Sequence, residues 1–87
     1  MDLVESTEKP SGSEVVGGFT LKTPVDAELL SDAPSRARTI NRLIIDGVNR
    51  NFPRRTDIDV VYYTKSFGEP HSNQIEVRIK ATAYQRC

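Results

Sequence analysis

The sequence has 87 residues, of which 12 are basic and 12 are acidic, so its net charge at neutral pH is zero. A chain of this length has room for one domain, whose core is small because folding buries only about 60% of the unfolded surface. The zero net charge argues against binding nucleic acid through bulk attraction alone. No run of 18 apolar residues occurs, so we expect no membrane-spanning helix.

Cysteine and histidine each occur once, as Cys87 and His71. A single cysteine cannot form an internal disulfide, and one histidine without a cysteine pair does not make a zinc site. The first residues are polar and acidic, without the cationic and apolar regions of an export signal. We therefore expect a reducing compartment, the cytoplasm, and neither a metal nor a cofactor.

The charges are unevenly distributed along the chain. Residues 1–34 carry seven acidic and two basic residues, a net charge of −5. Residues 35–56 carry six arginines and one acid, Asp46, a net charge of +5. Because the guanidinium group matches phosphate oxygens, the second segment is a candidate phosphate-contacting surface. The alternative is a solvated helix face whose charges pair with the acidic first third.

Residues 1–14 are polar and contain a Pro-Ser-Gly-Ser run, which predicts a flexible tail before a single domain at residues 15–87. Apolar and polar residues then alternate over residues 15–23, which predicts the first strand. Its two faces carry Phe19 and Leu21 on one side, and Thr20 and Lys22 on the other. Gly17 and Gly18 near its start indicate a bulge or a close backbone contact.

A helix-start pattern, Thr-Pro-Val-Asp, opens residues 23–31 and predicts a short helix. A long helix is predicted over residues 35–51, because apolar residues recur there at spacings of three and four. These residues are Ala37, Ile40, Leu43, Ile44, Val48 and Phe52. Gly47 costs such a helix about 1 kcal/mol relative to alanine, which indicates either close packing at this position or sequence drift.

Residues 58–65 and 74–84 carry the strongest strand patterns, and we expect them to pair as an antiparallel hairpin. Residues 66–73 between them are rich in turn formers and are expected to project as a loop. The predicted fold is α+β, in the order strand, short helix, long helix, strand, strand. Its simplest form is a three-stranded antiparallel sheet packed on one long helix.

Side chains that could carry catalysis are few. His71 beside Glu69 could act as a general base, but a polar loop favours a solvated histidine. Cys87 has no histidine nearby in the sequence to activate it. Asp57 and Asp59 share one strand face, and the alternation of that strand turns this face outward, which favours a solvated pair. We therefore expect a protein that is not an enzyme.

Two stretches resemble the ribbon-helix-helix repressors of the Arc and Mnt type. They are Phe19-Thr20-Leu21-Lys22-Thr23-Pro24 and Arg38-Thr39-Ile40-Asn41-Arg42-Leu43-Ile44, both within residues 19–52. In that family, a strand with the first pattern leads into the first helix, and the second pattern opens the second helix. The resemblance implies a homodimer whose two-stranded ribbon enters a DNA groove, with Thr20 and Lys22 facing the DNA.

A second resemblance is to the cystatins, through Val16-Gly17-Gly18 before a strand, a long helix and a hairpin. It implies an inhibitor module, and Lys65-Ser66-Phe67-Gly68 stands where the first inhibitory loop of that family would lie.

The leading prediction is a non-catalytic nucleic-acid-binding domain that uses the arginine-rich helix face. The predicted contacts are Thr20, Lys22, Arg38, Arg42, Arg50, Arg54 and Arg55. The alternative is a protein-interaction or inhibitor module that presents the loop at residues 66–73 and the sheet edges to a partner. The predicted contacts for that partner are Phe67, Gly68, Glu69, Pro70 and His71. An acidic protein surface is a further candidate partner for the arginines.

Overall fold

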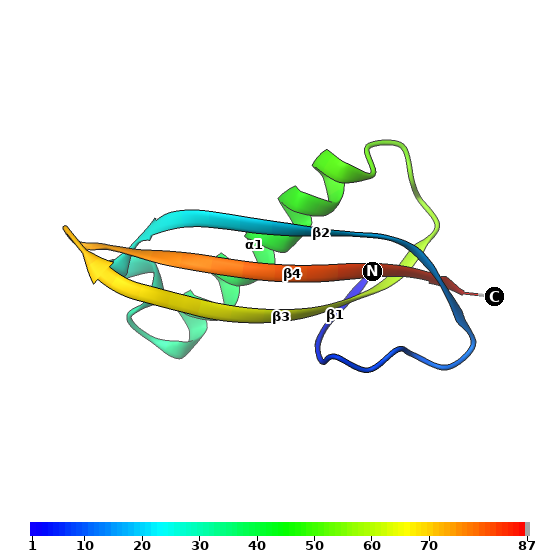
Figure 1. The fold of residues 1–87 in the computed structure, drawn as a ribbon, viewed down its shortest axis with the longest axis horizontal. Coiled ribbons are helices and arrows are strands. Elements are labelled where there is room, and N and C mark those ends of the chain that lie inside the picture. The colour runs from blue at the N-terminus through cyan, green and yellow to red at the C-terminus, as the bar shows by residue number, and fades with distance from the viewer. Residues whose placement is uncertain (87) are drawn as a thin grey trace.

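One four-stranded sheet carries a single long helix across one of its faces (Figure 1). The computed structural model describes residues 1–86, so Cys87 and the expectation about its reactivity lie outside the described residues. The elements in chain order are β1 (Asp2–Glu5), β2 (Ser13–Asp26), the 3-10 helix η1 (Ala27–Leu30), α1 (Ala33–Asn51), β3 (Ile58–His71) and β4 (Gln74–Arg86). The predicted α+β class is confirmed.

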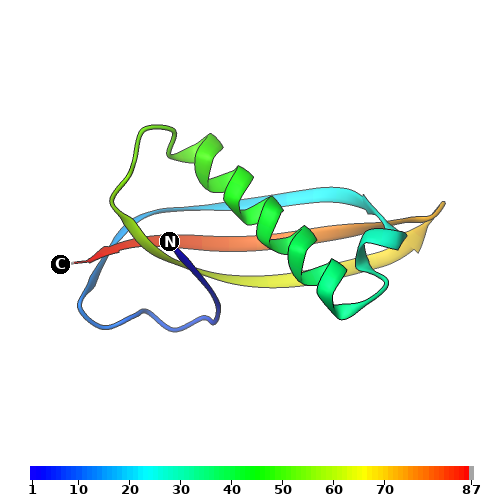
Figure 2. The same cartoon turned by 180° about the vertical axis from the view of Figure 1, so that it is seen from behind.

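The strand order is β1-β3-β4-β2, so the last strand along the chain lies inside the sheet. β4 is antiparallel to both β2 and β3, which makes β2 and β3 parallel to each other. The connection between these two parallel strands runs through η1 and α1, and this arrangement is a split β-α-β unit. α1 crosses the sheet obliquely (Figure 2).

The prediction of three antiparallel strands is wrong in detail, because β1 adds a fourth strand parallel to β3. β1 lies in the segment that was expected to be a flexible tail. Leu3 is half-buried and packs against the core, opposite Val61 of β3. Two apolar residues within a strand of four residues give too short an alternation to be recognised from the sequence.

β2 is longer than predicted and continues through the Thr-Pro-Val-Asp pattern to Asp26. The short helix is therefore confined to η1, four residues long. Burial of Val25 against the core favours the extended backbone here, and Pro24 is tolerated because β2 is an edge strand. The helix-start pattern at residue 23 was misleading for this reason.

α1 begins with a side-chain cap, since the backbone N–H of Ser35 donates to Oδ1 of Asp32 at 2.8 Å. Pro34 lies in the first turn, where its missing N–H leaves no helix hydrogen bond unmade. The buried side of the helix carries Ile40, Ile44 and Val48. Ala37, predicted on that side, is exposed.

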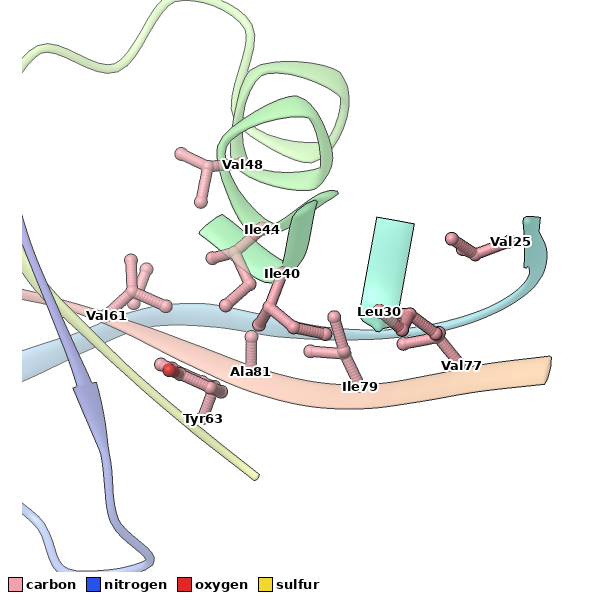
Figure 3. Packing of buried hydrophobic residues seen from close by; sticks show 11 residues of the cluster. Val25, Leu30, Ile40, Ile44, Val48, Val61, Tyr63, Val77, Ile79 and Ala81 are labelled. Atoms are coloured by element: carbon pink, nitrogen blue, oxygen red, sulfur yellow. The ribbon is translucent and has the colours of Figure 1, made fainter. Parts of the chain in front are cut away.

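The core lies between α1 and the helix-facing side of β2, β3 and β4 (Figure 3). Ile40 and Ile44 point from α1 toward Ile79 and Ala81 of β4, and Ile44 is fully buried. β4 presents small residues under the helix, and this allows the helix to approach the sheet closely. Leu30 of η1 closes the core at the end where α1 begins.

Two glycines lie beneath aromatic rings from the opposite layer. The ring of Phe19 in β2 packs on Gly47 of α1, and a Cβ at Gly47 would overlap it. The ring of Phe52 packs on Gly17 so that a Cβ there would lie 2.8 Å from Cε1. The β2 register also shifts between Val15 and Gly17. The predicted bulge and the predicted close contacts are confirmed.

The β3-β4 hairpin closes with a two-residue turn, so the prediction of a projecting loop over residues 66–73 is wrong. Ser72 and Asn73 have φ values of 52° and 67°, as a type I′ turn requires. The strands continue to His71 and from Gln74, with a register shift between Phe67 and Pro70. Gly68 and Pro70 are turn formers in isolation, but here they belong to an irregular stretch of strand.

Candidate nucleic-acid interface

The face of the sheet opposite α1, hereafter the open face, is not covered by a helix of residues 1–86 (Figure 1). Because side chains alternate along each strand, cross-strand neighbours that do not face α1 form rows on this face. One half of the face, the polar half, contains two rows. These rows are Lys22, Arg78 and Ser66, and Thr20, Lys80 and Thr64.

The polar half surrounds a shallow hollow of about 400 Å³. The residues that line this hollow include the six of the two rows and no acid. Lys65 also lines it, but its ammonium group pairs with Glu5 at 3.4 Å. Three hydroxyls and three cations are therefore gathered around one concave surface, and this combination suits phosphate oxygens.

One acid lies beside the polar half. Oε1 of Glu76 accepts a hydrogen bond from Nε of Arg78 at 2.6 Å and lies 3.9 Å from Nζ of Lys22. Lys80 is exposed and makes no ion pair within residues 1–86. Two of the three cations thus share one carboxylate, and the site retains a net positive charge.

The other half of the open face is aromatic. The rings of Tyr62 and Tyr84 meet edge to face with centroids 5.7 Å apart. Val4 and Val60 lie beside them in the same rows. Tyr84 is only 7% exposed although it does not face α1. Residues of the segment between β1 and β2 line two hollows beside these rings, one with both tyrosines and one with Tyr62.

The structure does not bring the seven predicted nucleic-acid contacts together. Thr20 and Lys22 lie on the open face, whereas Arg38 and Arg42 lie on α1, behind the sheet. The two arginines line a groove of about 550 Å³ whose other lining residues include Asp26 and Asp46. This groove is therefore balanced in charge, unlike the polar half.

The three remaining predicted arginines lie near the end of α1 or after it. Arg50 and Arg54 are exposed. Arg55 donates from Nε and Nη2 to the carboxylate of Asp57 at 2.7 and 2.6 Å, and also contacts Gln85. These hydrogen bonds lower the pKa of Asp57 and raise that of Arg55. Arg55 thus holds the start of β3 and is not free to meet a phosphate.

The five residues of the predicted partner-binding loop belong to the outer end of β3. Phe67 is 40% exposed there, and His71 is exposed next to the turn. The free edges of the sheet carry features that discourage strand addition. These are the register shifts in β2 and β3, Pro24 and Pro70, and Lys22. They disfavour a module that acts by adding a partner strand.

Residues 18–23, which the ribbon-helix-helix resemblance would pair with a second copy, pair with residues 77–82 of the same chain. Within residues 1–86 there is no group of three metal-ligating side chains. None of the helices in that range has both the length and the apolar composition needed to cross a membrane.

The fold and the site define a small α+β domain with one sheet face that no helix of residues 1–86 covers and that is cationic in one half. Comparison with protein-family models, with curated proteins and with solved structures finds no match.

Sequence reasoning missed Arg78, Lys80 and Tyr62 as members of a site. A signal existed for the first two, because the alternation in residues 74–84 places them on the polar side of the strand. What the sequence did not show was that β4 lies between β2 and β3, which brings these cations next to Lys22.

Proposed function

We propose that this domain binds nucleic acid, without catalysis, through the polar half of the open face. The observation that carries the proposal is the hollow of about 400 Å³ surrounded by Lys22, Arg78 and Lys80 and lined by no acid. Lysine and arginine contacts to phosphates supply most of the affinity of a protein for nucleic acid. The site gathers three side chains of this kind on a sheet, although the net charge of the chain is zero.

The hydroxyl groups strengthen this interpretation. Thr20, Thr64 and Ser66 lie next to Lys80 or Arg78 in the same rows and can donate to phosphate oxygens that the cations attract. The groove beside Arg38 and Arg42 is the weaker candidate, because two acids share its lining. The contact surface that we propose is thus the sheet and not the arginine-rich helix.

Two double variants with the same change in charge test the proposal. Lys22→Ala with Lys80→Ala removes two exposed cations from the polar half, and Arg38→Ala with Arg42→Ala removes two exposed cations from α1. We expect the first pair to lose at least 10-fold in affinity for labelled oligonucleotides at low salt, and the second pair to bind as the wild type does.

Fluorescence anisotropy with single-stranded and duplex oligonucleotides provides the measurement. A wild-type chain that retains neither form at low salt would overturn the proposal. A loss confined to the α1 pair would move the site to the helix and would equally contradict the surface proposed here. Circular dichroism of both variants checks that the fold is intact.

A further inference from the structure

The segment from Ser6 to Gly12, hereafter the strap, connects β1 to β2 along the aromatic half of the open face. Ser6 and Thr7 line a hollow of about 230 Å³ together with Tyr62, Tyr84 and Lys80. Pro10, Ser11 and Gly12 line a second hollow, of about 520 Å³, whose other lining residues also include Tyr62. The strap therefore runs beside the aromatic half, with hollows between it and the tyrosines.

The strap is weakly attached to the sheet. The backbone N–H of Ser6 donates to the carbonyl of Tyr63 at 3.0 Å, and the N–H of Glu8 is bonded only to the side chain of Ser6. Most strap side chains are exposed. A segment with few buried contacts and few bonds to its neighbours opens at low free-energy cost.

The strap also belongs to an acidic part of the chain. Residues 1–14 contain four acids and one lysine, a net charge of −3. Lys80 lies at the boundary, because it lines both the hollow under the strap and the hollow of the polar half. Within the strap itself Glu8 and Lys9 cancel, so the negative charge lies in the strands on either side of it, at Asp2, Glu5 and Glu14.

We propose that the ligand of the open face is a single strand of nucleic acid whose bases stack on Tyr62 and Tyr84 after it displaces the strap. The inference rests on the proposed function of the polar half. Aromatic side chains beside a cationic groove form a platform for unpaired bases, since every base has a π-face. A duplex hides those faces inside its stack.

The spacing of the side-chain rows on the open face supports this placement of the phosphates and bases. Consecutive rows on the open face are two residues apart, about 6.7 Å along the strand. The row of Tyr62 follows directly on the row of Lys80, so a strand whose phosphate lies on Lys80 brings its next base over the aromatic half. The strap adjoins that path, because Ser6 and Thr7 line one hollow together with Lys80 and Tyr62.

Substitutions at Tyr62 test the stacking. We expect Tyr62→Leu to weaken binding of an oligothymidylate of about 12 nucleotides by about 10-fold, and Tyr62→Phe to bind as the wild type does, because only the latter keeps a π-face. Phe67→Leu is the matched control, since it removes an exposed aromatic ring from the other end of β3. We expect that control to leave the affinity unchanged.

Hydrogen exchange tests the displacement. The amide of Ser6 is hydrogen-bonded to the sheet in the free chain, so its exchange should accelerate when the oligonucleotide is added. Replacement of residues 7–10 by glycine and serine should tighten binding of the single strand. In that background, Tyr62→Leu should still bind more weakly than Tyr62→Phe.

The outcomes separate the two proposals. If Tyr62→Leu binds like the wild type, the stacking is wrong. If the Ser6 amide is equally protected with the oligonucleotide bound, the displacement is wrong. In both cases, loss of binding in the Lys22 and Lys80 variant would still support the polar half as the contact surface. If the wild type prefers the duplex, the single-strand assignment fails. If no nucleic acid binds, the proposed function fails first.

Discussion

At the scale of single residues, two phenylalanine rings pack on glycines and leave no room there for a Cβ. Phe19 and Phe52 approach each other with ring centroids 6.3 Å apart, and each ring also lies on a glycine of the opposite layer. Gly47 and Gly17 are therefore retained for space and not for an unusual backbone angle, since neither has a positive φ. The cost of glycine in the helix is offset by the packed ring.

Gly47→Ala should destabilise the domain. The added methyl group overlaps the ring of Phe19, and overpacking of a core typically costs about 1 to 3 kcal/mol, more than the gain of about 1 kcal/mol in helix propensity. Urea unfolding measures the change in the free energy of unfolding. In a companion double variant, Gly47→Ala with Phe19→Leu, the loss in the free energy of unfolding should be smaller than the sum of the losses in the two single variants. An increase in stability for Gly47→Ala would contradict the contact.

At the scale of elements, the start of α1 depends on one carboxylate. Asp32 accepts a hydrogen bond from the N–H of Ser35, and this bond holds the pKa of Asp32 below its usual range. A group whose pKa is lower in the folded chain stabilises the fold while it is charged in both states. That contribution is present above the unfolded pKa, about 4, and is lost as the pH falls through the folded pKa.

Asp32→Asn should therefore lower the melting temperature at neutral pH, and its melting temperature should approach that of the wild type in acid. Asparagine caps helices as well as aspartate does but carries no charge. The difference in melting temperature between Asp32→Asn and the wild type should therefore be constant between about pH 6 and pH 8 and shrink below about pH 4. Thermal unfolding followed by circular dichroism measures it. Asp32→Ala, which also removes the acceptor, should remain less stable at every pH; a pH-independent difference for Asp32→Asn would rule out the charge effect.

The elements that the sequence predicted well are those with long periodic patterns. α1 was recognisable from six apolar residues at helical spacing, and β4 from eleven residues of alternation. β1 was missed because four residues are too few for a pattern, and the end of β3 because Gly68 and Pro70 resemble a turn. Tertiary burial of Val25 overrode the local helix signal that precedes η1.

The candidate site was predictable only in part, for a reason of topology. Thr20 and Lys22 could be placed on the polar side of a strand from alternation alone. Their neighbours Arg78 and Lys80 come from a strand more than 50 residues later, and strand order cannot be read from alternation. Composition alone favours the arginine-rich segment, but its arginines lie along and after α1, and the groove beside Arg38 and Arg42 also contains acids.

At the scale of the whole molecule, the zero net charge conceals a separation of charge across the fold. The open face gathers Lys22, Arg78 and Lys80 in one half, and the acidic residues 1–14 adjoin the other half. Three cations allow about three phosphate contacts, so few counterions are released on binding.

The salt dependence of binding should accordingly be shallow. For a single strand, three phosphate contacts predict that the logarithm of the association constant falls with the logarithm of salt concentration at a slope of about −2. Titrations between about 20 and 200 mM salt measure this slope, and Lys80→Ala should reduce it by about 0.7. A slope steeper than about −4 would mean that arginines of α1 also contact the nucleic acid.

The central position of β4 also determines when this domain can assemble. A ribosome makes β4 after the other three strands, and β2 has no sheet partner in residues 1–86 until β4 is available. Until then the apolar side of α1, with Ile40 and Ile44, has only half a sheet to cover it. The apolar side of α1 therefore stays partly uncovered from the completion of the helix until β4 is made, and β4 then joins β2 to the rest of the sheet.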